Sequence, residues 1–240
     1  MYLSKPTTYP SQPGKLLLFL TGGTGIHSTN NQLQADRFAS AGYLVAMPDQ
    51  FSNDPAPNTA TAINPSSEPS LIEQLKLGLA ATAKSFRIDM WLARHTPATV
   101  LPALNKVLDA LQDEFADAVS NGGGVYGVGY CFGAKYVLLL ASEVQADVAH
   151  GERAADEHGA AEEGMVRRGS RLKAGAVAHG TLVGREDLES LAAPVGIVAV
   201  KGDGLFPDEV REEGVKRARE RGAEVQELSL IHISEPTRPY

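Results

Sequence analysis

The sequence has 240 residues, of which 43% are hydrophobic and 21% are charged, a composition typical of a globular chain rather than a disordered or fibrous one. The net charge of -7 and the pI near 5.4 argue against nucleic acid or an anionic membrane as a partner. The single cysteine permits no internal disulfide, the N-terminus lacks a signal-peptide pattern, and no apolar run is long enough to span a membrane. We therefore expect one soluble, cytoplasmic domain.

The first elements predict a strand, a helix and a second strand. The continuous apolar run 15–20 is typical of a strand buried on both faces of a parallel sheet, and a glycine-rich loop over 21–27 follows it. The pattern of 31–41 predicts a helix that ends at Gly42, and 43–47 predicts the next strand. Strands joined in this way are parallel. A proline-rich surface loop is expected over 52–69, and helices over 71–93 and 101–115.

The central stretch of the chain is 124–136, where small and β-branched residues lead into Gly129-Tyr130-Cys131-Phe132-Gly133 and then into good helix formers. This pattern predicts a strand, a sharp turn and a helix, which is the setting of a nucleophile elbow. Cys131 would stand at the helix N-terminus, where unpaired N–H groups and the helix dipole favour a thiolate. The alternative is that Cys131 is a small buried apolar residue.

The second half of the chain continues the alternation of strands and helices. Strands are expected over 172–179, 195–200 and 223–227, and helices over 185–191 and 209–221. The charged stretch 143–168 predicts a solvated insertion. The fold class is therefore α/β, with a doubly wound, mostly parallel sheet whose strand ends gather at one ligand-binding edge.

Several candidate site residues fall at that edge. Attack by the Cys131 thiolate on an ester or thioester carbonyl builds negative charge on oxygen, and the backbone N–H groups of Phe132 and Gly23 are the candidate donors to it. Asp203, in a turn after a strand, is a candidate for orienting a histidine. His179 and His27 are expected to line the pocket, His179 in preference to serving as the base. No pattern indicates a metal site or a cofactor.

The quoted residues resemble the dienelactone hydrolase family, which are α/β-hydrolases with a Cys, Asp, His triad. The elbow carries the likeness, and it extends to Thr21 to His27, Pro48-Asp49, Trp91 with His95, and Asp203 with Phe206-Pro207. The resemblance implies an α/β-hydrolase fold over 1–227, a cysteine nucleophile at Cys131, a triad acid at Asp203, and small esters or lactones as substrates, as for a carboxymethylenebutenolidase. Gly22 departs from the pattern, because family members usually carry a carboxylate there that governs the resting state of the thiol.

The histidine of the family triad follows the last strand in a His-Gly-Phe setting, which this sequence lacks. His232 stands near the expected distance, but 228–240 resembles a translated sequencing adapter, so we interpret it as a non-native tail. The sequence therefore predicts a chain truncated at the C-terminus, with activity impaired by loss of the histidine. The abrupt start of the chain suggests that leading strands are missing as well.

Two other functions remain open. The loop Thr21-Gly22-Gly23-Thr24-Gly25, with Asp49 ending the next strand, imitates the fingerprint of an NAD(P)-binding reductase, although a glycine is missing at Ser28. A non-catalytic, hydrolase-like protein would need no histidine at all.

Overall fold

The apolar strand β2 (Lys15–Leu20) lies at the centre of the fold in the computed structural model of the chain, which describes residues 1–57, 87–145 and 167–230. Leu16 to Leu20 are each at most 5% exposed, which confirms a strand buried on both faces. β2 pairs in parallel with β3 (Tyr43–Met47) on one side and β4 (Tyr126–Tyr130) on the other.

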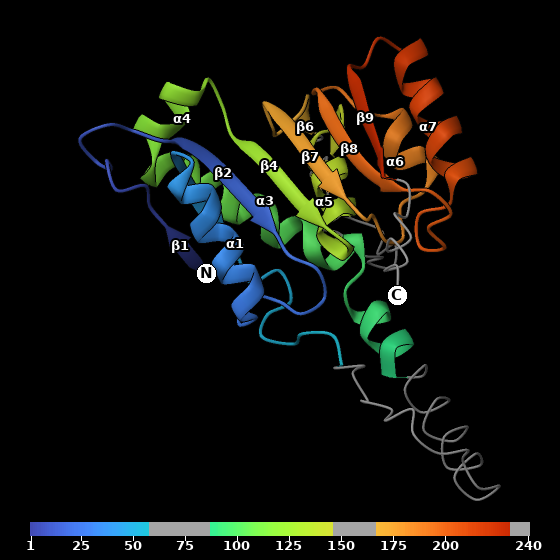
Figure 1. Ribbon diagram of the computed structural model, residues 1–240, viewed down its shortest axis with the longest axis horizontal. Helices are drawn as coiled ribbons and strands as arrows, with labels where there is room; N and C mark the ends of the chain where they lie inside the picture. The colour runs from blue at the N-terminus through green and yellow to red at the C-terminus, as the bar shows by residue number, and fades with distance from the viewer. Residues whose placement is uncertain (58–86, 146–166, 231–240) are drawn as a thin grey trace, which may run out of the picture.

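The described strands form a seven-stranded sheet in the order β1-β3-β2-β4-β7-β8-β9 (Figure 1). Only β1 runs antiparallel to its neighbour, so the predicted mostly parallel sheet is confirmed. The bounds of the remaining strands are β1 Tyr2–Ser4, β7 Ala174–Ala178, β8 Val195–Val200 and β9 Val225–Leu230. A separate pair, β5 (Val144–Gln145) and β6 (Arg167–Arg168), is antiparallel.

Helices flank the sheet. Their bounds are α1 Thr29–Ser40, α3 Pro97–Glu114, α4 Ala116–Gly122, α5 Phe132–Leu140, α6 Arg185–Glu189 and α7 Asp208–Glu220, and residues 87–94 are also helical. Figure 1 shows α1 in front of the sheet and α3 and α5 behind it. No helix of the described residues is long and apolar enough to cross a membrane.

The alternating side chains of β2 divide the core into two layers. Leu16, Leu18 and Leu20 belong to the larger layer, which includes the apolar faces of α3 and α5. Leu17 and Phe19 belong to the smaller layer, with two alanines of α1. A strand with helices on both faces in this way is the arrangement expected of a doubly wound α/β fold.

The predicted elements differ from the structure mainly at their ends. The last strand extends to Leu230, three residues beyond the expected end at Glu227, because β9 stays paired with β8 as far as Val200. Most of the expected loop 52–69, helix 71–93 and insertion 143–168 lie outside the described residues, as do 231–240 of the expected tail.

Candidate active site

The bend between β4 and α5 has the geometry of an elbow. Cys131 lies between the last residue of β4 and the first residue of α5, with φ 53° and ψ −116°. A positive φ in a residue with a Cβ costs on the order of 1–3 kcal/mol and persists only where the surrounding structure enforces it. The sharp strand-to-helix turn predicted around Cys131 is therefore present, and the cysteine is only partly buried.

The two glycines that flank Cys131 are required by close backbone contacts. A Cβ on Gly129 would lie 2.6 Å from the carbonyl oxygen of Gly133. A Cβ on Gly133 would lie 2.2 Å from the carbonyl oxygen of Leu20 at the end of β2. Any side chain at either position would push α5 away from the strands, so the glycines allow the elbow to close.

An aromatic cluster supports the elbow from the side of the larger core layer. The ring of Phe132 lies with its centroid 5.4 Å from that of Phe51, 5.0 Å from that of Trp91 and 5.1 Å from that of Tyr136. Burial, with a smaller contribution from the charge of Asp187, raises the pKa of Tyr136. Its hydroxyl therefore stays protonated and donates a hydrogen bond to the carbonyl oxygen of His95 (2.9 Å).

The loop after β2 lies directly against the elbow. A Cβ on Gly22 would stand 3.3 Å from the Cβ of Cys131. The carbonyl oxygen of Gly23 accepts a hydrogen bond from the N–H of Ala56 (2.8 Å), which fixes the orientation of this peptide. Phe132 is the first residue of α5, so its N–H has no acceptor within the helix. The loop and the helix N-terminus thus meet beside the thiol.

Sequence reasoning did not single out Thr181, whose side chain contacts the thiol. Its Oγ1 lies 3.2 Å from the Sγ of Cys131. The N–H of Thr181 also donates to the carbonyl oxygen of Cys131 (3.1 Å). Thr181 lies three residues after the end of β7, and the parallel pairing of β7 with β4 brings it to the elbow. A hydroxyl residue near the end of a neighbouring strand is too common a pattern to have indicated this contact.

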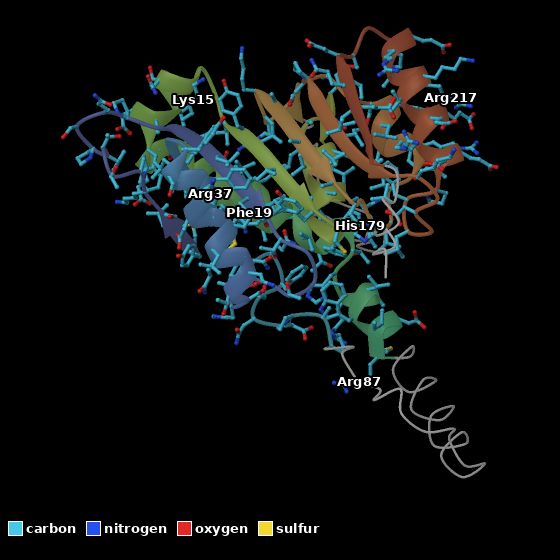
Figure 2. The ribbon with its side chains drawn as sticks, viewed as in Figure 1. Lys15, Phe19, Arg37, Arg87, His179 and Arg217 are labelled. Atoms are coloured by element: carbon cyan, nitrogen blue, oxygen red, sulfur yellow. The ribbon has the colours of Figure 1, made fainter. Side chains whose placement is uncertain are left out.

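The structure pairs His179 with Asp203. The Nδ1 atom of His179 lies 2.7 Å from Oδ2 of Asp203, and Oδ1 of Asp203 accepts a hydrogen bond from the N–H of Leu205 (2.9 Å). The side chain of Asp203 is 8% exposed and that of His179 is 52% exposed. Figure 2 shows His179 at the end of the sheet opposite Lys15, the residue that begins β2.

The predicted site residues therefore form two groups at one edge of the sheet. Cys131 and Phe132 lie beside the loop that contains Gly23, and His179 lies with Asp203 at the ends of β7 and β8. Among the described residues, no hydrogen bond joins the His179 ring to the thiol. His27 is exposed ahead of α1, and His232 lies outside the described residues. No group of three or more metal-ligating side chains occurs in the described ranges.

Two grooves of the described surface lie away from the elbow. A groove of about 240 Å³ runs over β4 and β7 beside α1 and is lined by Leu17, Phe38, Tyr43, Tyr126, Gly127, Val128 and 174–176. The second, of about 200 Å³, lies where β7, β8 and β9 begin. Neither of these two grooves contains Cys131.

Comparisons with known proteins agree with the fold. The sequence model of the dienelactone hydrolase family matches residues 2–166. The chain is 29% identical over 197 residues to "Hydrolase pyvD" of Aspergillus violaceofuscus, covering 82% of this chain and 59% of that protein. It is 25% identical to "Dienlactone hydrolase 1" of Gibberella moniliformis, covering 97% and 71%. A structure of a putative dienelactone hydrolase from Klebsiella pneumoniae superposes with a TM-score of 0.60 at 18% identity, covering 94% of this chain and 76% of that one.

Proposed function

The chain belongs to the dienelactone hydrolase family, and from this membership we propose that it hydrolyses ester or lactone bonds of small molecules with Cys131 as the nucleophile. The observation that carries the proposal is the conformation of Cys131, which is held at φ 53° between β4 and the N-terminus of α5. A strained residue with a nucleophilic side chain is a feature of catalytic sites. The chain spans 59% of the length of the relative from Aspergillus, so the activity of the whole protein is part of this proposal.

The proposed reaction proceeds through a thioester. The Cys131 thiolate attacks the carbonyl carbon of the substrate, and the carbonyl oxygen takes up the negative charge. The N–H groups of Gly23 and Phe132 are the proposed donors to this oxyanion. The C–O bond to the leaving alcohol then breaks, and the alcohol oxygen takes a proton from solvent. Water attacks the thioester and gives a proton back to solvent, the C–S bond breaks, the carboxylic acid is released, and the Cys131 thiolate is restored.

The Asp203 and His179 pair is the proposed acid–base couple. If Nδ1 of His179 donates its proton to the Asp203 carboxylate at 2.7 Å, Nε2 is left with a free lone pair. Such a nitrogen can take a proton from water during breakdown of the thioester. Because no hydrogen bond joins this ring to the thiol among the described residues, we expect slow turnover. The impairment expected from the missing His-Gly-Phe therefore stays a prediction.

Hydrolysis of p-nitrophenyl acetate tests the nucleophile. We expect the chain to release p-nitrophenol. The rate for Cys131→Ala is expected to be at least 10²-fold lower, because this change removes the side chain of the elbow that attacks the ester. Equal rates for the two proteins would remove Cys131 from the proposal.

A non-catalytic, hydrolase-like protein is the competing function, and it is favoured because no hydrogen bond joins the His179 ring to the thiol among the described residues. Iodoacetamide at neutral pH separates the two. Rapid alkylation of Cys131 supports the enzyme, whereas an unreactive thiol supports a non-catalytic protein with the hydrolase fold.

A further inference from the structure

We propose that Thr181 is a positioning residue for the nucleophile, whose hydroxyl donates a hydrogen bond to the Cys131 sulfur and so raises the fraction of thiolate. This inference rests on the proposed function, since it assigns a task to Thr181 only if Cys131 reacts. Its basis is the 3.2 Å distance between Oγ1 of Thr181 and Sγ of Cys131. A thiolate carries no proton, so in that state the hydroxyl is necessarily the donor.

Backbone hydrogen bonds fix the turn that carries Thr181 onto the elbow. The N–H of Cys131 donates to the carbonyl oxygen of Ala178 (3.2 Å), and the N–H of Thr181 donates back to the carbonyl oxygen of Cys131 (3.1 Å). The elbow and the turn after β7 are therefore joined on both sides of the reactive residue. A hydroxyl held in this way needs little reorganisation to meet a charge on sulfur.

A side-chain contact from α5 holds the far end of the same turn. The ammonium group of Lys135 donates to the carbonyl oxygen of Leu182 (2.8 Å) and to the Asp187 carboxylate (2.7 Å). Within the turn, His179 and Leu182 both adopt positive φ, at 50° and 59°. Positive φ is unfavourable for residues that carry a side chain, and here it occurs twice within four residues. The contacts around the turn must therefore impose its shape.

The loop after β2 offers no competing side chain at the thiol. A Cβ on Gly22 would stand 3.9 Å from Sγ, but glycine places nothing there. The ionisable groups on the described elements around the elbow include Tyr130 on β4, Tyr136 on α5 with His95, Lys135 with Asp187, and His179 with Asp203. Among the described residues, the Thr181 hydroxyl is the side-chain group within hydrogen-bond distance of the sulfur.

The test is the rate of alkylation of Cys131 by iodoacetamide between pH 5 and pH 10, followed by intact-protein mass spectrometry. In this reaction the thiolate forms a bond to the methylene carbon and iodide leaves. Since the chain has one cysteine, the carbamidomethyl groups that appear on the parent chain and not on Cys131→Ala report on Cys131. Thr181→Val removes the hydroxyl at nearly constant shape. We expect the midpoint of the pH–rate profile of this variant to rise by about one pH unit and its alkylation rate at pH 7 to fall about tenfold. The reason is that the variant loses a hydrogen bond to the charged thiolate.

Two further variants at position 181 and one control at another threonine make the result specific. Thr181→Ser keeps the hydroxyl and is expected to stay within about twofold of the parent rate, and Thr181→Ala is expected to repeat the shift if the valine does not fold. Thr99→Val, an exposed threonine of α3, is the matched control and is expected to leave the profile unchanged. An unshifted midpoint in both the valine and the alanine variants would overturn the proposal.

Alkylation needs no ester, so the two proposals can fail separately. A shifted midpoint in Thr181→Val together with unchanged ester hydrolysis by Cys131→Ala would refute the proposed function while supporting the contact. Cys131-dependent hydrolysis together with an unshifted midpoint would refute the role of Thr181 alone.

Discussion

At the scale of single residues, the candidate site depends on backbone geometry as much as on side-chain chemistry. Three residues with side chains near the proposed reaction centre have positive φ: Cys131, His179 and Leu182. Each conformation costs on the order of 1–3 kcal/mol, and the interstrand and turn hydrogen bonds offset that cost. The site residues therefore owe their positions to contacts made elsewhere in the sheet.

The His179 and Asp203 pair gives a prediction for turnover. His179→Gln and Asp203→Asn are each expected to lower kcat for p-nitrophenyl acetate by about 10²-fold, because either change removes the oriented proton acceptor. Since the two act as one unit, the double variant is expected to be no slower than the single ones. Steady-state kinetics on the three proteins check this, with Glu209→Gln on the exposed face of α7 as the control. Full activity of His179→Gln would show that another base, or none, operates.

Gly133 gives a prediction for stability. Gly133→Ala places a methyl group 2.2 Å from the carbonyl oxygen of Leu20, so we expect a loss of about 2–3 kcal/mol in the free energy of unfolding despite the better helix propensity of alanine. Gly196→Ala in β8 meets no atom within 4 Å and is expected to change stability by less than about 0.5 kcal/mol. Urea unfolding of both variants is the measurement, and similar losses in the two would contradict the packing described for the elbow.

At the scale of elements, α5 connects the nucleophile to the turn after β7. Its N-terminus carries the elbow, and one turn further along Lys135 binds both the turn and Asp187 of α6. Asp187 is 5% exposed on its side chain and Lys135 is 16% exposed, so this ion pair is largely shielded from solvent. A buried charge that loses its partner is strongly destabilising.

Lys135→Met tests that connection. Asp187 would keep the N–H of Gly184 as a partner but lose its counter-charge, so we expect a loss of about 3 kcal/mol in the free energy of unfolding. Lys216→Met is the matched control, because Lys216 and Glu220 are an exposed pair 3.9 Å apart whose loss is expected to cost less than about 1 kcal/mol. Urea unfolding compares them. If Lys135→Met were no worse than Lys216→Met, the turn after β7 would not depend on α5.

At the scale of the whole molecule, the order of the strands determines where chemistry can occur. β2 lies between β3 and β4, so the chain connections leave the centre of the sheet in opposite directions at the ends of β2 and β4, which is where open α/β sheets bind their ligands. The glycine loop and the elbow both lie at this end of the sheet. On the face covered by α1, no described helix lies over β7, and Ala176 there is exposed (Figure 1).

A reductase would bind a dinucleotide at the same end of the sheet, which gives a further prediction. Helix α1 begins at Thr29, well after β2 ends at Leu20, so the tight strand-to-helix turn that holds a pyrophosphate is not formed. We expect NADPH to cause no change in Tm, measured by thermal shift against a buffer control at matched ionic strength. A rise in Tm that grows with NADPH concentration would revive the reductase.

The sequence by itself determined the layered fold and the elbow, because both depend on local patterns. Uninterrupted apolar runs indicate buried parallel strands, and glycines on either side of Cys131 indicate a close turn. Only the tertiary structure decided which side chains meet the thiol. Thr181 is 50 residues from Cys131, and His179 is 24 residues from Asp203. Such contacts come from the order and register of strands, which no local pattern encodes.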